Sequence, residues 1–234
     1  MANIHLIGTI HYELNGTERL KKALQVEKPG ILTVEASQKW LDYLDKHWYL
    51  DLEMCIQTIK EKGFSQQAYS FFEDYLKSAS NYEIDVCREY SNQTDTPLHL
   101  IDDIRMVNRL RQETLSQFQL FFKNIDPITL DKISRNSVIR GHDAIYQIIQ
   151  KLYDGEIPAI FGEQQLINPA RGKLIGKRDE TEARTLIELA QDNDAKIVHV
   201  GGCAHNLTDS KGETLYSRLK PLNPTRATLL SYDK

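Results

Sequence analysis

The first 35 residues constrain the fold more than any other part of the chain, because two short apolar runs enclose one amphipathic segment. Residues 4–10 (IHLIGTI) are rich in branched apolar side chains, and residues 31–35 (ILTVE) form the second run. Between them, apolar residues recur at helical spacing around Leu20 and Leu24, and Pro29 cannot continue the helix. A strand, a short helix and a second strand within this length predict a βαβ unit with parallel strands.

The segments that follow extend this pattern. Further strands are expected at 98–104, 196–202 and 227–232. Helices are expected at 38–93, at 105–153 with a break near Asp126-Pro127, and at 179–191, where Asp179 and Glu182 have the spacing of a capping box. Within residues 157–178, the segment IPAIFGE favours a strand, and the segment QQLINPARGKLIGKR that follows it favours a loop. We predict one α/β domain over residues 1–234, with a mostly parallel central sheet, flanking helices and a large helical insertion at about 38–153 between its two halves.

The amino-acid composition limits the partners and the cellular compartment that we expect for this protein. The 29 Lys and Arg residues against 33 Asp and Glu give a net charge of −4, which offers no general attraction to nucleic acid. Three scattered cysteines without a CxxC motif indicate reduced thiols rather than disulfides or a zinc knuckle. No leader-like segment and no apolar run near the ~18 residues of a membrane span is found. We therefore expect a cytoplasmic protein that binds neither nucleic acid nor membrane.

An internal repeat marks two strand ends. The heptapeptides HLIGTIH, which ends at His11, and HVGGCAH, which ends at His205, both fit the pattern H-x-x-G-x-x-H. The central glycine of each copy, Gly8 or Gly202, permits a sharp exit from the strand. Ligands of an open parallel sheet bind beyond the carboxyl ends of its strands. We therefore expect His11 and His205 to share one mouth of the sheet.

Other polar residues accompany the repeat. His5 and His199 lie inside the strands and are expected to support the site from beneath. Glu35 directly follows the second apolar run, and Arg178 precedes a helix whose N-terminus favours anionic groups. Two imidazoles and a carboxylate suit either a catalytic metal with open positions or an acid–base cluster without metal. Cys203, two residues before the second repeat histidine, is expected to be a packed thiol rather than a nucleophile.

The motifs GTIH (8–11), VEAS (34–37), GKRDETEA (176–183) and IVHVGGCAH (197–205) together resemble the TraB/GumN family, which includes the Tiki proteins. That family is distantly similar to erythromycin esterases and to ChaN-like haem-binding proteins. Its pattern of two GxxH motifs, a glutamate and an arginine matches Gly8, His11, Glu35, Arg178, Gly202 and His205. The segment LHLIDDI has Asp103 where the family carries an arginine, so the resemblance assigns no role to Asp102.

The resemblance implies a metal-dependent hydrolase of peptide or amide bonds. His11, Glu35 and His205 would hold a divalent ion (zinc, manganese or cobalt), with Arg178 near the oxyanion. Two alternatives stay open: a metal-free ester or lactone hydrolase with a histidine base, and a non-catalytic protein that sequesters peptides. Each alternative takes a peptide or small-molecule ligand, and each requires the four side chains to face one pocket.

Overall fold

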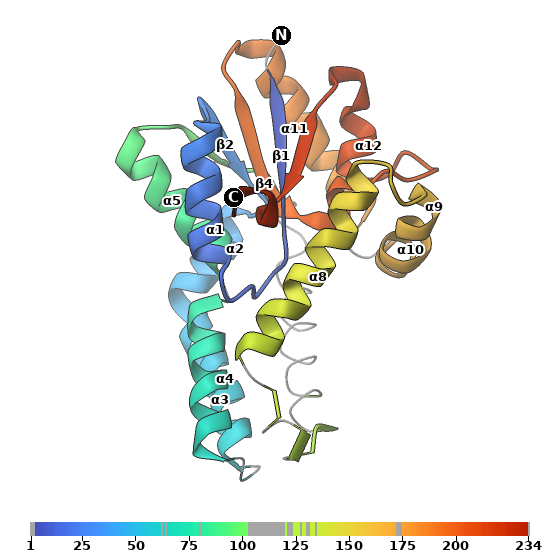
Figure 1. Ribbon diagram of the computed structural model, residues 1–234. Helices are drawn as coiled ribbons and strands as arrows, with labels where there is room; N and C mark the ends of the chain where they lie inside the picture. Colours follow the sequence, from blue (N-terminus) through green and yellow to red (C-terminus); the bar gives the residue numbers. More distant parts are fainter. Residues whose placement is uncertain are drawn as a thin grey trace.

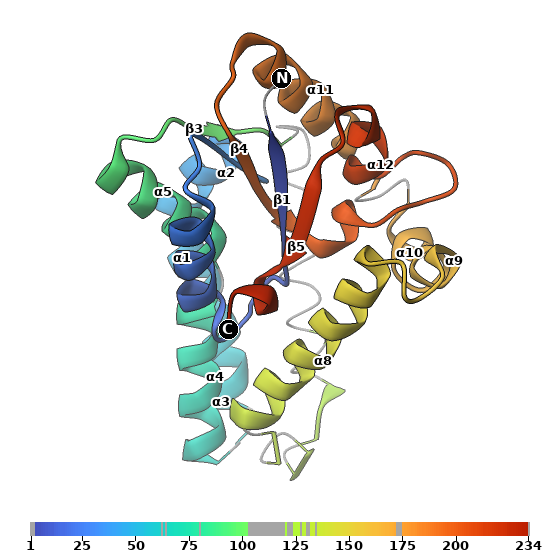
Figure 2. The same cartoon turned by 45° about the horizontal axis from the view of Figure 1, so that its top comes forward.

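The computed structural model contains a sheet of five parallel strands in the order β3-β2-β4-β1-β5 (Figure 1 and Figure 2). The strands are β1 (Ile4–Thr9), β2 (Ile31–Val34), β3 (Leu98–Leu100), β4 (Ile197–Gly202) and β5 (Thr225–Thr228). The predicted α/β fold with a parallel central sheet is confirmed. The structure describes residues 3–61, 63, 65–79, 81–102, 120, 124–126, 128–129, 132–133, 135–171 and 175–233.

Helices cover the sheet and extend beyond it. Those before β3 are α1 (Gly16–Glu27), α2 (Gln38–Tyr43), α3 (Tyr49–Glu61), α4 (Gln66–Ala79) and α5 (Tyr82–Thr94), with a π-helical turn at Leu44–Trp48. Those after β3 include α8 (Arg135–Tyr153), α9 (Ala159–Gly162), α10 (Asn168–Ala170), α11 (Lys177–Asp192) and α12 (Leu215–Leu219). Short turns of π- or 3₁₀-helix occupy Glu163–Ile167, Cys203–Asn206, Lys220–Leu222 and Leu229–Tyr232. Within the described part of the chain, no helix is long and apolar enough to cross a membrane.

The strands carry apolar side chains on both faces because helices cover both. Ile7 of β1 belongs to a cluster with Leu24 of α1, whereas the preceding residue, Leu6, packs with Leu186 of α11. Figure 2 shows α1 and α11 on opposite sides of the strands. Two-sided burial explains why β1 and β4 are continuous apolar runs rather than alternating ones.

The predicted helical region at 38–93 is present as α2 to α5. Helices α3 and α4 pack on each other through a hydrophobic cluster of their own, which includes Ile59 and Phe72. In Figure 1 this pair extends below the sheet, on the side toward which the strands point. Of the helical block predicted at 105–153, α8 is observed, whereas residues 105–119 lie outside the described residues.

Three segments differ from the expectation. The possible strand at IPAIFGE is instead helix α9, which begins after Pro158, where the missing amide of proline costs a helix nothing. The last strand is Thr225–Thr228 rather than 227–232, because residues 229–232 turn into a 3₁₀-helix. That turn brings the hydroxyl of Tyr232 2.7 Å from Nε2 of His5. Strand β3 ends at Leu100, earlier than the predicted 104.

Candidate active site

The two repeat histidines lie at the ends of neighbouring strands. Strands β1 and β4 pair in parallel, with Thr9 opposite Gly202. A β-carbon placed on Gly202 would lie 3.6 Å from Nε2 of His11 and 3.4 Å from Cδ2 of His205. The same point is 3.6 Å from Oε2 of Glu35. The structure therefore brings these three predicted side chains together around one glycine.

Glu35 is held at both carboxylate oxygens. Its Oε1 lies 2.6 Å from Nη2 of Arg178, and its Oε2 accepts a 2.6 Å hydrogen bond from the Gly202 amide. Burial favours the neutral form of this carboxyl, but the neighbouring cations, Arg178 first among them, outweigh burial and hold the pKa of Glu35 well below its ordinary value. A side chain at Gly201 would approach Oε2 to 2.8 Å, so a glycine is needed there.

Arg178, the second residue of α11, joins Glu35 to a carboxylate from a third strand end. Its Nε and Nη2 donate to the two oxygens of Asp102 at 2.6 and 2.7 Å, in the bidentate geometry that suits a guanidinium. The carboxylates of Glu35 and Asp102 keep the pKa of Arg178 above its ordinary value despite burial. Asp102, to which the sequence pattern assigned no role, thus anchors the arginine.

His205 is buried and paired with Asp179. Its Nδ1 lies 2.9 Å from Oδ1 of Asp179, and its Nε2 faces Oε1 of Glu35 at 3.5 Å. Burial lowers the pKa of an imidazole, but the charges of Glu35 and Asp179 outweigh it and raise the pKa of His205 to about 10. The imidazole is therefore a cation at neutral pH, with a proton on each nitrogen.

Asp179 has more partners than its predicted capping role required. Helix α11 begins at Lys177, two residues before the predicted start, and Asp179 accepts the amide proton of Gly176 at 2.9 Å. It also accepts the Leu215 amide at 2.7 Å, which connects the helix to α12. The other residue of the predicted capping box, Glu182, lies fully buried 3.7 Å from Nε of Arg178. Burial and the charge of Glu35 raise the pKa of Glu182 well above its ordinary value.

His11 differs from His205 because its side chain is 59% exposed. Its Nδ1 lies 2.8 Å from Oε1 of Glu83, at the start of α5, and its Nε2 faces Gly202. Desolvation opposes the charged form, but the charge and hydrogen bond of Glu83 outweigh it and raise the pKa of His11. Solvent at the exposed ring screens part of this attraction.

The two inner histidines do not share one environment. His199 lies beneath the site: its Nδ1 is 3.0 Å from Oγ1 of Thr33, and burial lowers its pKa to about 4, so it stays neutral. His5 instead bonds Thr225 and Tyr232, each at 2.7 Å. Because His5 pairs with Val198 rather than with His199, the two rings point to opposite faces of the sheet. The expected support is therefore observed for His199 and is wrong for His5.

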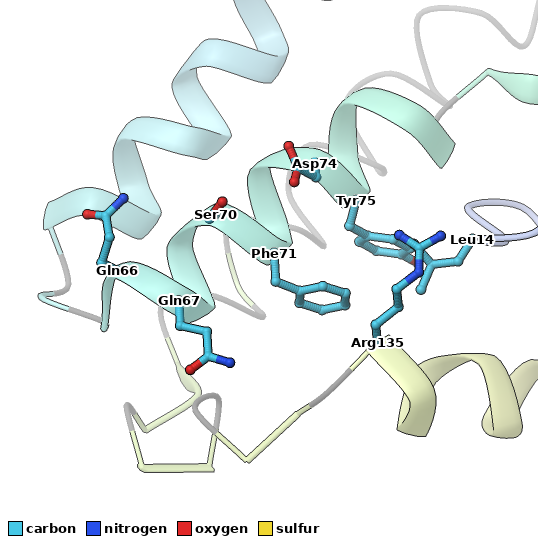
Figure 3. A pocket seen from close by; sticks show the side chains of 8 residues that line it. All are labelled: Leu14, Gln66, Gln67, Ser70, Phe71, Asp74, Tyr75 and Arg135. Carbon is cyan, nitrogen blue, oxygen red and sulfur yellow. The ribbon is translucent and has the colours of Figure 1, made fainter.

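A pocket separate from these residues lies between α4 and the start of α8. It has a volume of about 580 Å³, and Figure 3 shows the side chains of α4 and the start of α8 around it. Phe71 and Tyr75 of α4 stack with their ring centroids 6.1 Å apart. Arg135 of α8 and Leu14 complete this side of the lining. Leu14 belongs to the loop that carries His11, so the cavity adjoins a segment of the site.

The side chains predicted to bind a metal ion are His11, Glu35 and His205. Within the ranges the structure describes, no three His, Cys, Asp or Glu side chains are arranged as a metal site. Both oxygens of Glu35 are engaged, and the Arg178 guanidinium at 2.6 Å would repel a dication bound there. Metal binding at His205 would require loss of the proton that Glu35 and Asp179 favour on its ring. These contacts fit an acid–base cluster better than a metal centre, and metal binding remains a prediction.

Sequence reasoning did not identify the three carboxylates that bind Arg178, His205 and His11. They are Asp102, Asp179 and Glu83, respectively. Asp102 follows an apolar strand as Glu35 does, and that position was the available signal. Glu83 lies in a helix and carries no local signal.

Comparison of the chain with protein-family models, curated proteins and solved structures finds no significant match. The resemblance to the TraB/GumN family therefore remains a prediction.

Proposed function

We propose that this protein is a hydrolase of ester or amide bonds that uses His11 as general base. The observation that carries the proposal is the position of His11: Glu83 binds its Nδ1, and its Nε2 faces the Gly202 end of β4 beside Glu35 and His205. A carboxylate on one ring nitrogen fixes the tautomer and orients the other nitrogen as a base. The half-exposed ring is also open to water and substrate.

The proposed reaction begins when Nε2 of His11 accepts a proton from a water molecule whose oxygen attacks the carbonyl carbon of the substrate. The resulting imidazolium then returns that proton to the departing alcohol or amine, so the base is regenerated. Glu83 stabilises the transient imidazolium, as its effect on the pKa of His11 indicates. The acidic product leaves with the oxygen that came from water.

Two buried cations suit the negative charge that develops on the carbonyl oxygen. Arg178 and protonated His205 both lie against Glu35, which holds them in place while Asp102 and Asp179 bind their other donors. To bind either cation, the oxyanion would take the place of one carboxylate contact, while the remaining contacts keep the cation in position. This arrangement supports the metal-free form of hydrolase over the metal-dependent form.

The metal-dependent form is the second candidate, and one observation favours it. Nε2 of His11, Oε2 of Glu35 and the His205 ring surround one point at Gly202, as a shared ligand would require. For that form, Glu35 must release Arg178 and His205 must lose a proton. We therefore treat it as a proposal that the following experiment separates from the first.

The test is hydrolysis of aryl esters, lactones and a peptide library by purified protein, measured with and without EDTA and with added zinc, manganese or cobalt. We expect turnover that survives EDTA and that falls at least ~100-fold in His11→Gln, since general-base catalysis contributes that much. His47→Gln, at an exposed histidine on the π-helical turn, is the matched control. Turnover only with added metal favours the second candidate, and binding of peptides without turnover overturns both.

A further inference from the structure

The residue before His11 is held at both of its backbone groups. The amide of Ile10 donates to the hydroxyl oxygen of Tyr146 at 3.0 Å, and the hydroxyl of Tyr82 donates to the Ile10 carbonyl at 3.0 Å. The two tyrosines come from α8 and α5, which are 64 positions apart at these residues. Both side chains are almost fully buried. The direction in which the chain leaves β1 is therefore set by two hydroxyls from helices outside the sheet.

The acceptor at Tyr146 is itself fixed in place. Its hydroxyl donates to Oε2 of Glu13 at 2.5 Å, and Nη1 of Arg19 donates to Oε1 of Glu13 at the same distance. Arg19 also binds Asp143 of α8 at 2.8 Å. The Tyr146 hydroxyl accepts from the Ile10 amide and donates to Glu13, and consecutive hydrogen bonds in such a chain strengthen one another. The loop after β1 and helix α8 are therefore joined as one unit.

Tyr82 acts on the same loop from the other side. A β-carbon at Gly16 would come within 2.5 Å of the Tyr82 ring, so the start of α1 lies directly on that ring. The next residue in the chain is Glu83, which binds Nδ1 of His11. A shift of Tyr82 would thus move both ends of the Glu83–His11 contact: the backbone that carries the imidazole and the carboxylate that orients it.

We infer that Tyr82 and Tyr146 are positioning residues that hold His11 in register with Glu83 and with the end of β4. The inference rests on the proposed function, because it assigns these hydroxyls to the orientation of the general base. It goes beyond that function because it assigns to α5 and α8 the role of orienting the general base. Neither tyrosine touches the substrate, and their effect reaches the site through Ile10 and Glu83.

The direct test is the tautomer of neutral His11, read from the ¹⁵N chemical shifts of the two ring nitrogens. The Glu83 contact requires the Nδ1–H form in the wild-type protein. In Tyr146→Phe and Tyr82→Phe we expect the ratio of Nδ1–H to Nε2–H to fall about fivefold. This change corresponds to loss of the net stabilisation of one hydrogen bond, here the bond between Glu83 and His11. Two variants are used so that the failure of one to fold leaves the test intact.

Tyr232→Phe is the matched control. Its hydroxyl is equally well bonded, to His5 and Glu27 at 2.7 Å each, but these partners lie away from the His11 loop. We expect this control to lose stability like the other two variants and to leave the His11 tautomer unchanged. The difference separates positioning of His11 from a general loss of stability.

Kinetics give the second measure. We expect Tyr146→Phe and Tyr82→Phe to lower kcat on the order of 10-fold with KM within twofold, because misplacement of a reacting group affects turnover more than binding. A wild-type His11 in the Nε2–H form overturns the Glu83–His11 pair and with it the proposed function. A wild-type Nδ1–H form that neither tyrosine variant changes overturns the positioning inference alone.

Discussion

Replacing Asp179 by asparagine tests the charge balance of the site most directly. Asp179 is fully buried and accepts from His205 and from the amides of Gly176 and Leu215. The Leu215 amide and His205 bind Oδ1 whereas the Gly176 amide binds Oδ2, so the single oxygen of an asparagine keeps only one of these two positions. The substitution therefore removes an amide contact as well as the charge. The lost amide contact does not depend on the protonation of His205, so the pH-dependent part of the loss isolates the interaction of the carboxylate with the imidazolium.

The magnitude follows from the pKa of His205, which is raised from 6.5 to about 10. Because the folded-state pKa lies above the unfolded one, the stabilisation is fully present below pH 6.5 and is lost as the pH rises through 10. For this displacement, the linkage relation gives a contribution on the order of 4 kcal/mol at pH 7, which falls to roughly 1–2 kcal/mol at pH 9. Glu35 and Asp179 share it, so we expect the pH-dependent part of the loss in Asp179→Asn to be about 2–3 kcal/mol at pH 7, in addition to the cost of the lost amide contact.

The assay is urea unfolding of both proteins at pH 6.5, 8 and 9.5, followed by the fluorescence of the two tryptophans. We expect the difference in unfolding free energy between wild type and Asp179→Asn to shrink steadily as the pH rises. The control is Asp42→Asn on the exposed side of α2, for which the difference is expected to be within about 0.5 kcal/mol at every pH. A difference for Asp179→Asn that is independent of pH would refute a charged His205 as its cause.

Three further predictions concern the neighbouring groups. For Glu83→Gln, we expect the pH at which kcat/KM rises on the acidic side to move downward, because Glu83 raises the pKa of His11 and the base acts when deprotonated; an unmoved pH–rate profile contradicts the pairing. For Gly201→Ala, we expect a loss of about 1–3 kcal/mol in stability, since the new methyl would lie 2.7 Å from Nε2 of His199. The control is Gly141→Ala in α8, where the methyl meets open space and is expected to stabilise the protein by about 0.5–1 kcal/mol. Denaturant titration of both variants measures the difference. For removal of metal by EDTA and dialysis, we expect an unchanged thermal unfolding midpoint, and a fall reversed by zinc, manganese or cobalt would support the metal-dependent form.

The parallel sheet and the meeting of the predicted residues could be derived from local sequence. Each of His11, Glu35 and His205 follows an apolar run at or just beyond a strand end, and strand ends of a parallel sheet lie at one edge. The inner histidines show the limit of this reasoning. The repeat places His5 and His199 at equal positions, but the register pairs His5 with Val198, and a difference of one residue reverses the face of the sheet.

The contacts that decide the chemistry lie beyond the reach of local pattern. Glu83 is 72 positions from His11, and Asp102 is 76 positions from Arg178, so neither pair leaves a periodic or motif signal. Each partner can be recognised only after helix and strand packing has placed it. The sequence pattern of imidazoles and one carboxylate is therefore equally compatible with a metal site and an acid–base site. The placement of Arg178 bears on the choice: its guanidinium occupies Glu35, and the carboxylates around His205 raise the pKa of that ring, so the observed contacts favour the acid–base site that we propose.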